Sequence, residues 1–400
     1  MTVLVLSYSA LDTRPIGRWL HEAGDLVLVT TRAARAASPP EECARFGEIV
    51  LVDDYFSNDV MLAAQALARR HSPAHVIASN EHDLIRAAVL REQYRLPGQR
   101  VEAALAYRDK LTMRQVTAAG AVTVPRFRAV RSLADATGFA AENGFPVVVK
   151  PRRGTGALGI TVARSRGDLH RAVEAASTAP GGVLVESYVA APIYHVDGIS
   201  VDGRVVHCWP SRYSDGALET VQRGAPRVSM LLDAADPLRP LLQDFAARVI
   251  AAFPATGAFA FHLEAWVDGG VPILCEITAR TGGGPIGEAY EHAFGVNLYR
   301  ESFLAQAGLA LTLTEQPARP LRYVGWIGFL TGDGTFTPPT TGRPPVTWFR
   351  TVHEPGRVCR RARMMSDFAA YALVDGASAD QTVARGRELI RWWDAGRPWR

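Results

Sequence analysis

Two acidic residues lie on neighbouring apolar segments of the 400-residue chain and suggest a metal site. Glu264 ends the run Phe-His-Leu-Glu, and Glu276 lies in the run Leu-Cys-Glu-Ile-Thr. The turn Asp268-Gly269-Gly270 between the two runs predicts a hairpin, which places both carboxylates on one face of a sheet. Adjacent carboxylates repel each other unless they share a cation, and oxygen ligands with free positions are typical of Mg²⁺ sites. We therefore predict that Glu264 and Glu276 bind a metal ion, with a pair of solvated surface charges as the alternative.

The residues around this pair have the types that bind an anion. His262 lies two positions before the first acid and therefore faces the same way; it is a candidate catalytic residue, or it packs behind the carboxylates. Arg280 follows the second acid by four positions, and an Arg side chain can hold an anion through two parallel hydrogen bonds. Gly283 and Gly284 come next, where backbone N–H groups can approach a ligand closely and stabilise an oxyanion. We predict these four residues as catalytic.

Lysine is rare in this chain, because only Lys110 and Lys150 are lysine among 44 Lys and Arg residues. Lysine carries a compact point charge, whereas arginine is a wide planar fork, so a narrow phosphate site would keep lysine. Lys150 ends an apolar run and precedes a glycine-rich loop at 154–159, which is followed by the strand-like residues 160–163. A dinucleotide-binding loop would open a helix instead, so this loop is predicted to be a flap that covers phosphates. The predicted phosphate-binding residues are Lys110, Lys150, Gly154, Thr155, Gly156 and Gly159.

Strands and helices alternate along the first hundred residues, which predicts a parallel, doubly wound sheet. A small α+β lobe follows, with one helix expected at 108–119, and antiparallel hairpins begin near residue 194. Arg212, Arg223 and Arg227 are assigned to the solvated surface, since arginine is so abundant. The predicted divisions are an N-terminal Rossmann-like domain at 1–105, a small lobe at 106–188, a large lobe with the metal site at 189–310, and a C-terminal extension packing on the large lobe at 311–400.

The composition excludes several classes of protein. With 48% hydrophobic and 21% charged residues, the chain is not disordered as a whole. The net charge of +4 without a basic run does not favour nucleic acid. No apolar run reaches the length that spans a membrane, and the N-terminus does not have the pattern of a signal peptide. The four cysteines show no CxxC pair, which is typical of reduced thiols in a cytoplasmic protein.

The order of these motifs resembles the ATP-grasp superfamily of carboxylate–amine ligases over roughly residues 1–310. The resemblance rests on Arg108-Asp109-Lys110, the run 147–151, the loop 154–159, the run 185–189, and the two acidic segments with Arg280. Gly295-Val296-Asn297-Leu298, after the glycine run, is most similar to the amino-acid and dipeptide ligase branch, which includes carnosine synthase-like enzymes. The implied fold is α/β and α+β, with a Rossmann-like parallel sheet, a small α+β lobe and a larger antiparallel lobe.

The resemblance also implies roles for individual residues. The two lysines contact ATP phosphates, and Glu186, Ser187 and Val189 border the adenine. Asp197 would replace the ribose-binding acid that the family has at the position of Ile193. The two acids hold Mg²⁺, with Thr278 standing as a weaker ligand where the family often has Asn, and Arg280 steadies the γ-phosphate.

The implied activity is ATP- and Mg²⁺-dependent formation of an amide bond between a carboxylate, expected to belong to an amino acid, and an amine, through an acyl phosphate. The partners are then small-molecule carboxylate and amine substrates, and a homodimer is typical of such ligases. Two alternatives stay open: an ATP-grasp carboxylase or ligase of nucleotide metabolism, and an ATP-binding module without turnover.

Overall fold

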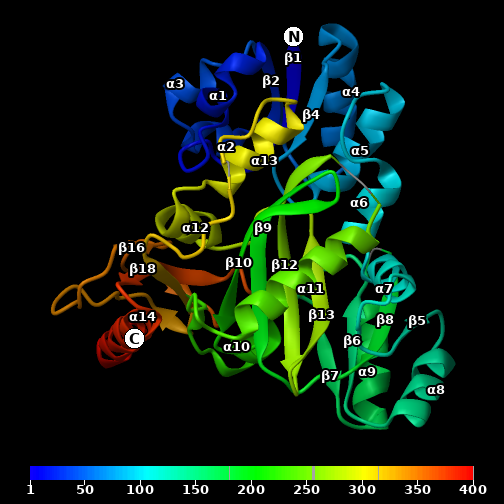
Figure 1. Ribbon diagram of the computed structural model, residues 1–400, viewed down its shortest axis with the longest axis vertical. Helices are drawn as coiled ribbons and strands as arrows, with labels where there is room; N and C mark the ends of the chain where they lie inside the picture. The colour runs from blue at the N-terminus through cyan, green and yellow to red at the C-terminus, as the bar shows by residue number, and fades with distance from the viewer. Residues whose placement is uncertain (180, 255–256, 314, 400) are drawn as a thin grey trace.

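A computed structural model describes residues 1–179, 181–254, 257–313 and 315–399 (Figure 1). Within these residues the strands form one parallel sheet, one small antiparallel sheet, one large antiparallel sheet and a two-stranded ribbon. The ribbon pairs β15 (Gly334–Thr335) with β17 (Val358–Cys359).

The N-terminal sheet is parallel, with the strand order β3-β2-β1-β4, which confirms the predicted doubly wound sheet. Its strands are β1 (Thr2–Leu6), β2 (Asp25–Thr31), β3 (Glu48–Val52) and β4 (His75–Ala78). The helices between and after them are α1 (Ile16–Trp19), α2 (Arg32–Ala37), α3 (Pro40–Cys43), α4 (Asp59–His71), α5 (Asp83–Gln93) and α6 (Val101–Arg108), with a 3₁₀ turn at His21–Ala23. The apolar residues of β1, β2 and β4 are buried on both sides, as is typical of parallel strands, whereas the edge strand β3 is only partly buried.

The small lobe has a four-stranded antiparallel sheet in the order β5-β8-β6-β7. It contains α7 (Lys110–Ala119), β5 (Phe127–Val130), α8 (Leu133–Asn143), β6 (Val147–Pro151), β7 (Thr161–Ala163), α9 (Arg166–Ala176) and β8 (Val183–Ser187). Successive side chains of β6 point to opposite faces of this sheet, and this alternation decides which of them face the cavity. Val147 and Val149 are buried in the lobe's core, so Val148 and Lys150 point to the other face.

The helix expected at 108–119 is present as α7 but begins at Lys110, because Asp109 caps it. Its Oδ1 accepts hydrogen bonds from the N–H groups of Leu111 and Thr112 and so caps α7. Asp109 also forms ion pairs with Arg152 and Arg153 from the start of the flap loop. This cap places Lys110 in the first turn of α7, where the helix dipole disfavours a cation and a neighbouring carboxylate must offset it.

The large sheet has eight strands in the order β13-β12-β9-β10-β11-β14-β18-β16. They are β9 (Ile193–Val201), β10 (Arg204–Tyr213), β11 (Arg227–Leu231), β12 (Ala258–Asp268), β13 (Val271–Thr278), β14 (Tyr323–Leu330), β16 (Trp348–Thr351) and β18 (Phe368–Gly376). The accompanying helices are α10 (Ala217–Arg223), α11 (Leu238–Ala252), α12 (Ile286–Phe294), α13 (Leu298–Gln306) and α14 (Ala379–Ala395).

The C-terminal residues do more than pack on this sheet, since β14, β16 and β18 extend it by pairing beyond β11 (Figure 1). Helix α13 reaches in the opposite direction. Its Phe303 and Leu304 are buried with Val3, Val5 and Ile77 of the parallel sheet. The parallel sheet, the small lobe and the large antiparallel sheet agree with the predicted fold class, whereas the exact domain ranges stay a prediction.

Within the described ranges, no helix combines the length and apolar character needed to cross a membrane.

His207, on β10, gives a pH-dependent prediction for stability. Burial lowers the pKa of this imidazole from 6.5 to about 4, and its Nδ1 contacts the Tyr290 hydroxyl at 2.5 Å. Because the folded pKa lies below the unfolded value, the stabilisation is complete above pH 6.5 and is lost as the pH falls towards 4. We expect His207→Gln to reduce the dependence of the free energy of unfolding on pH by up to about 1.4 kcal/mol per pH unit in this window.

Urea unfolding at several pH values measures this slope. His21→Gln, which changes an exposed histidine, should retain the wild-type slope. Identical slopes in the wild type and His207→Gln would contradict the assignment.

Candidate active site

A cavity of about 370 Å³ lies between the small lobe and the large sheet, and most of the predicted site residues line it. From the small lobe and the start of α7 come Lys110, Lys150, Thr155, Gly156, Glu186, Ser187 and Val189; from the large sheet and the loop after it come His262, Glu264, Glu276, Thr278, Arg280, Gly283 and Gly284. Residues far apart in the sequence are thus brought to one space.

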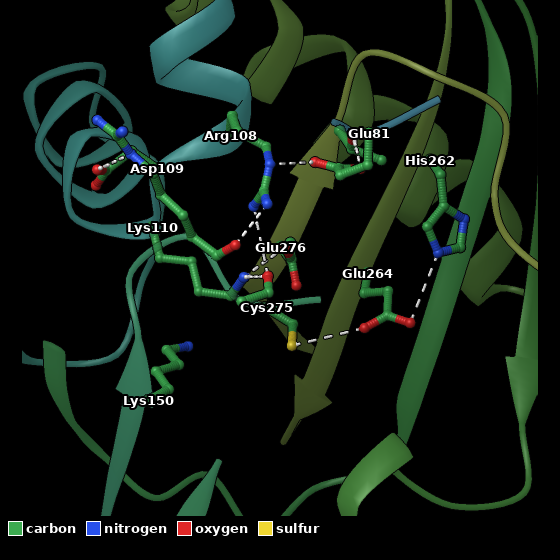
Figure 2. Close-up of polar contacts among 12 residues, drawn as sticks. Glu81, Arg108, Asp109, Lys110, Lys150, His262, Glu264, Cys275 and Glu276 are labelled. Atoms are coloured by element: carbon green, nitrogen blue, oxygen red, sulfur yellow. Dashed lines mark hydrogen bonds and ion pairs between the residues drawn. The ribbon is translucent and has the colours of Figure 1, made fainter. Parts of the chain in front are cut away.

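The two predicted metal carboxylates form a cross-strand pair. Glu264 on β12 is directly opposite Glu276 on β13, so both side chains project from one face of the hairpin, as the turn had predicted. Figure 2 shows the two carboxylates facing the same space, with both lysines on one side and His262 on the other. Two carboxylates that line an accessible cavity are an oxygen donor set of the kind that Mg²⁺ takes. The residues present therefore fit a magnesium ion.

Lys110 connects the small lobe to this pair. Its Nζ donates to Glu276 Oε1 at 2.8 Å and to the carbonyl of Gly154 at 3.1 Å. The ammonium group therefore lies between the Glu276 carboxylate and the flap. The Glu276 carboxylate offsets the unfavourable dipole at the start of α7.

Lys150 belongs to a buried network of charges. Its Nζ pairs with Glu186, whose other carboxylate oxygen accepts from Arg114 Nε at 2.6 Å. Burial disfavours the charged carboxylate, but the two cations outweigh it, so the pKa of Glu186 lies below its ordinary value. Glu186 thus lines the cavity as an ionised group that fixes Lys150, in addition to any contact with a ligand.

The structure contradicts the role predicted for Asp197. This residue is buried on β9, is not among the residues that line the cavity, and pairs with His195 at 2.5 Å and His262 at 2.8 Å. A ribose hydroxyl cannot reach a carboxylate enclosed in this way. Asp197 instead supports His262, whose Nε2 lies 3.6 Å from Glu264 Oε1.

His262 is consequently charged. Burial opposes the imidazolium, but Asp197 and Glu264 outweigh it and raise the pKa of His262 to about 9. The pKa of Glu264 falls to about 2, because His262 and Arg227 together outweigh its burial. The imidazolium therefore positions an ionised Glu264, which agrees with the packing role considered for His262.

Thr278 has a different contact from the predicted metal ligation. Its hydroxyl donates to Glu81 Oε2 at 2.8 Å, and Arg280 Nε donates to the same oxygen at 2.6 Å. Arg108 Nε lies 3.5 Å from the other oxygen of Glu81. Glu81 thus orients Arg280, and Thr278 completes that arrangement.

Glu81 is a functional candidate that the sequence interpretation missed, and Arg227 is one that it considered for a substrate carboxylate but assigned to the surface. Glu81 directly follows β4 at the carboxyl edge of the parallel sheet, where ligand-binding residues of such sheets gather, so its position was a usable signal. Arg227 is only 3% exposed and lines the cavity, so its assignment to the solvated surface is wrong. Arg212 and Arg223 are exposed, as expected.

The glycine-rich loop joins two antiparallel strands, β6 and β7, as the flap hypothesis required. Thr155 and Gly156 line the cavity, whereas Gly154 and Gly159 are absent from its described lining. Gly154 contributes its carbonyl to Lys110, and Gly159 has a φ of +76°, which favours glycine. The Gly156 carbonyl accepts a hydrogen bond of 3.0 Å from the N–H of Met365, in the segment before β18.

Comparison with known proteins agrees with this geometry. The family model described as the ATP-binding domain of the carbamoyl-phosphate synthase L chain matches residues 109–197. An L-arginine-specific L-amino acid ligase of Bacillus subtilis is 25% identical over 304 residues, which are 72% of this chain and 72% of that protein.

Solved structures show the same fold. An L-amino acid ligase from Bacillus licheniformis has a TM-score of 0.76 at 18% identity and covers 98% of this chain and 97% of its own. A second similar structure is the biotin carboxylase domain of a 2-oxoglutarate carboxylase from Hydrogenobacter thermophilus, solved with MgADP. It has a TM-score of 0.70 at 19% identity, and the match covers 98% of this chain and 89% of that chain.

Residues 109–197 match an ATP-grasp domain, and the chain has the fold of the L-amino acid ligase structure. Over most of its length it is similar to L-amino acid ligases.

Proposed function

We propose that this enzyme uses ATP and Mg²⁺ to join the carboxylate of an amino acid to an amine. The observation that carries the proposal is the cross-strand pair of Glu264 and Glu276, which faces Lys110 and Lys150 in one cavity. Phosphoryl transfer requires positioning and neutralisation of charge more than covalent chemistry from the protein, and this cavity supplies both. The similarity to L-amino acid ligases supports an amino acid as substrate.

The chain's own residues would act as follows. Lys110 and Lys150 bind the phosphates of ATP, and the backbone of Ser187 and Val189 borders the adenine. Glu264 and Glu276 hold Mg²⁺, which neutralises the charge that develops on the phosphates when it is bound. Arg280, oriented by its hydrogen bond to Glu81, holds the substrate carboxylate beside the γ-phosphate.

Two bond exchanges complete the reaction. A carboxylate oxygen of the substrate attacks the γ-phosphorus, and the bond from that phosphorus to the bridging oxygen breaks, which releases ADP. The amine nitrogen then attacks the acyl carbon, a C–N bond forms, and the C–O bond to phosphate breaks. The amine loses its proton to solvent, and the N–H groups of Gly283 and Gly284 stabilise the oxyanion that forms during this attack.

The test is ADP release from ATP and Mg²⁺ with amino acids supplied in pairs, followed by mass spectrometry of the product. We expect an amide product, one ADP per amide, and loss of turnover when EDTA removes the metal. Turnover with bicarbonate instead of an amino acid would indicate a carboxylase. Tight ATP binding without turnover for any pair would indicate a binding module.

Glu81→Gln tests the positioning of Arg280. The substitution removes the negative charge between Arg280 and Arg108, and we expect ADP release to slow by about 10- to 100-fold, since a misplaced substrate group has this effect. The KM for ATP should change little, because Glu81 contacts the acid-binding end of the cavity. Glu102→Gln, on the exposed face of α6, is the matched control. Wild-type turnover in Glu81→Gln would contradict this role.

A further inference from the structure

One end of the cavity has aromatic walls that the proposed chemistry does not use. We call it the aromatic chamber and define it by Tyr213, Trp326, Met365, Phe368 and Tyr371, all of which line the cavity. These residues come from β10, β14 and β18 and the segment before β18, on the C-terminal side of the large sheet. The ring centres of Tyr213 and Phe368 both lie 6.4 Å from that of Trp326, and the ring centres of Phe368 and Tyr371 are 4.6 Å apart.

The chamber adjoins the acid-binding end of the site. Gly283 and Gly284 follow Arg280 and line the same cavity. A Cβ at Gly284 would lie 3.4 Å from Cη2 of Trp326, so this loop runs against the edge of the indole. A substrate whose carboxylate is held by Arg280 therefore has its side chain within reach of Trp326.

The charges beside Tyr213 restrict what this side of the chamber can hold. The guanidinium of Arg227 lies 3.4 Å from the centre of the Tyr213 ring, and Nη2 lies 3.6 Å from Glu264 Oε1. This buried cation disfavours a cationic side chain nearby. It is already paired with Glu264, so an additional buried carboxylate would lack a free partner. Aromatic rings pack best against a neutral ring or a large apolar group.

We propose that the aromatic chamber binds the side chain of the carboxylate substrate, which is an amino acid with an aromatic or large apolar side chain. This inference rests on the proposed function and adds the substrate class. The amino acid that fills the chamber supplies the carbonyl group of the product.

Hydroxylamine tests the proposal without knowledge of the natural amine. Its nitrogen attacks the acyl phosphate, phosphate leaves, and a hydroxamate forms, so the product identifies the acid that was activated. We expect kcat/KM with Phe, Tyr or Leu to exceed that with Ala, Lys or Glu by about tenfold or more. Equal values for Phe and Ala, or a preference for Lys or Glu, would overturn the proposal. In the assay with pairs of amino acids, a product in which mass spectrometry places the aromatic residue at the amine end would also overturn the proposal.

Trp326→Ala should remove the preference for Phe over Ala, while Trp326→Phe should keep it. Leu321→Ala, which changes a side chain that is 78% exposed just before β14, is the matched control and should behave as wild type. If Trp326→Ala fails to fold, Phe368→Leu makes a smaller change in the same chamber and should reduce the preference. An unchanged preference in Phe368→Leu would then count against the chamber.

The experiment separates this inference from the proposed function. If Ala and Phe are activated equally well, the ligase function stands and the chamber assignment fails. If no acid releases ADP, the ligase function fails, and calorimetric titration of the wild-type enzyme with Phe and with Ala decides on the chamber. If the wild-type enzyme binds Phe and Trp326→Ala does not, the chamber assignment is supported. If the wild-type enzyme binds Phe and Ala equally, or binds neither, the assignment is overturned.

Discussion

Glu276→Gln should abolish turnover while leaving the fold intact. The substitution preserves the shape of the side chain but removes one of the two negative charges that face each other across β12 and β13. A magnesium ion held by one carboxylate loses affinity and position, and we expect ADP release to fall by about 10³-fold or more. The side chain of Glu276 is 36% exposed at the edge of the cavity, so the fold should persist, while loss of the ion pair with Lys110 should lower the melting temperature.

Titration with Mg²⁺ distinguishes a metal role from a general electrostatic one. In Glu276→Gln the concentration of Mg²⁺ that supports half-maximal activity should rise. Glu174→Gln, on the exposed face of α9, should leave both quantities unchanged. Near-wild-type turnover in Glu276→Gln would exclude this residue as a metal ligand.

Lys150→Arg should weaken ATP binding, even though it keeps the positive charge. Lys150 is enclosed by Glu186 and Arg114, and its side chain is only 6% exposed. A planar guanidinium needs more width than an ammonium group, and it would crowd the guanidinium of Arg114 that already occupies the other carboxylate oxygen. We expect an ATP dissociation constant about 10- to 100-fold larger, which corresponds to roughly 1.4–2.8 kcal/mol.

Calorimetric titration with ATP measures this change directly. The reverse type of substitution, Arg166→Lys on an exposed part of α9, should bind ATP as the wild type does. Wild-type affinity in Lys150→Arg would remove the argument that this site selects for lysine.

The sequence predicted best those parts of the molecule whose signals are local. The hairpin of β12 and β13 follows from alternating side chains and an Asp-Gly turn, and with it the facing pair of Glu264 and Glu276. The strand β6 followed by glycines similarly predicts the flap. The metal and phosphate roles of these residues stay predictions, but the geometry that the roles require is present.

The features that were missed depend on contacts between distant segments. The start of α7 at Lys110 instead of 108 depends in part on Arg152 and Arg153, which hold the carboxylate of the capping residue Asp109 from the flap loop. The strand β14 contains glycines that weaken any local strand signal. A Cβ at Gly328 would lie 2.3 Å from Phe368, so the glycine is required by a side chain of the neighbouring strand.

Asp197 was placed wrongly for a related reason. Its position on a strand close to the adenine-binding segment suggested a role in the ligand site. One real partner, His195, lies two positions before it on β9, and the other, His262, becomes its neighbour only when β12 pairs with β9. Local spacing could not reveal that both carboxylate oxygens are already occupied inside the sheet.

The hydrogen bond between the Gly156 carbonyl and the Met365 N–H joins the cover of the nucleotide to the segment that carries Phe368. If ATP and the acyl donor both order this shared segment, binding of one reduces the conformational entropy that the other must lose. The gain in binding free energy is then the same for both ligands. On the proposed function, we therefore expect nucleotide retention and donor selection to be thermodynamically linked. We expect such an enzyme to hold its triphosphate most tightly when the preferred acyl donor is already bound.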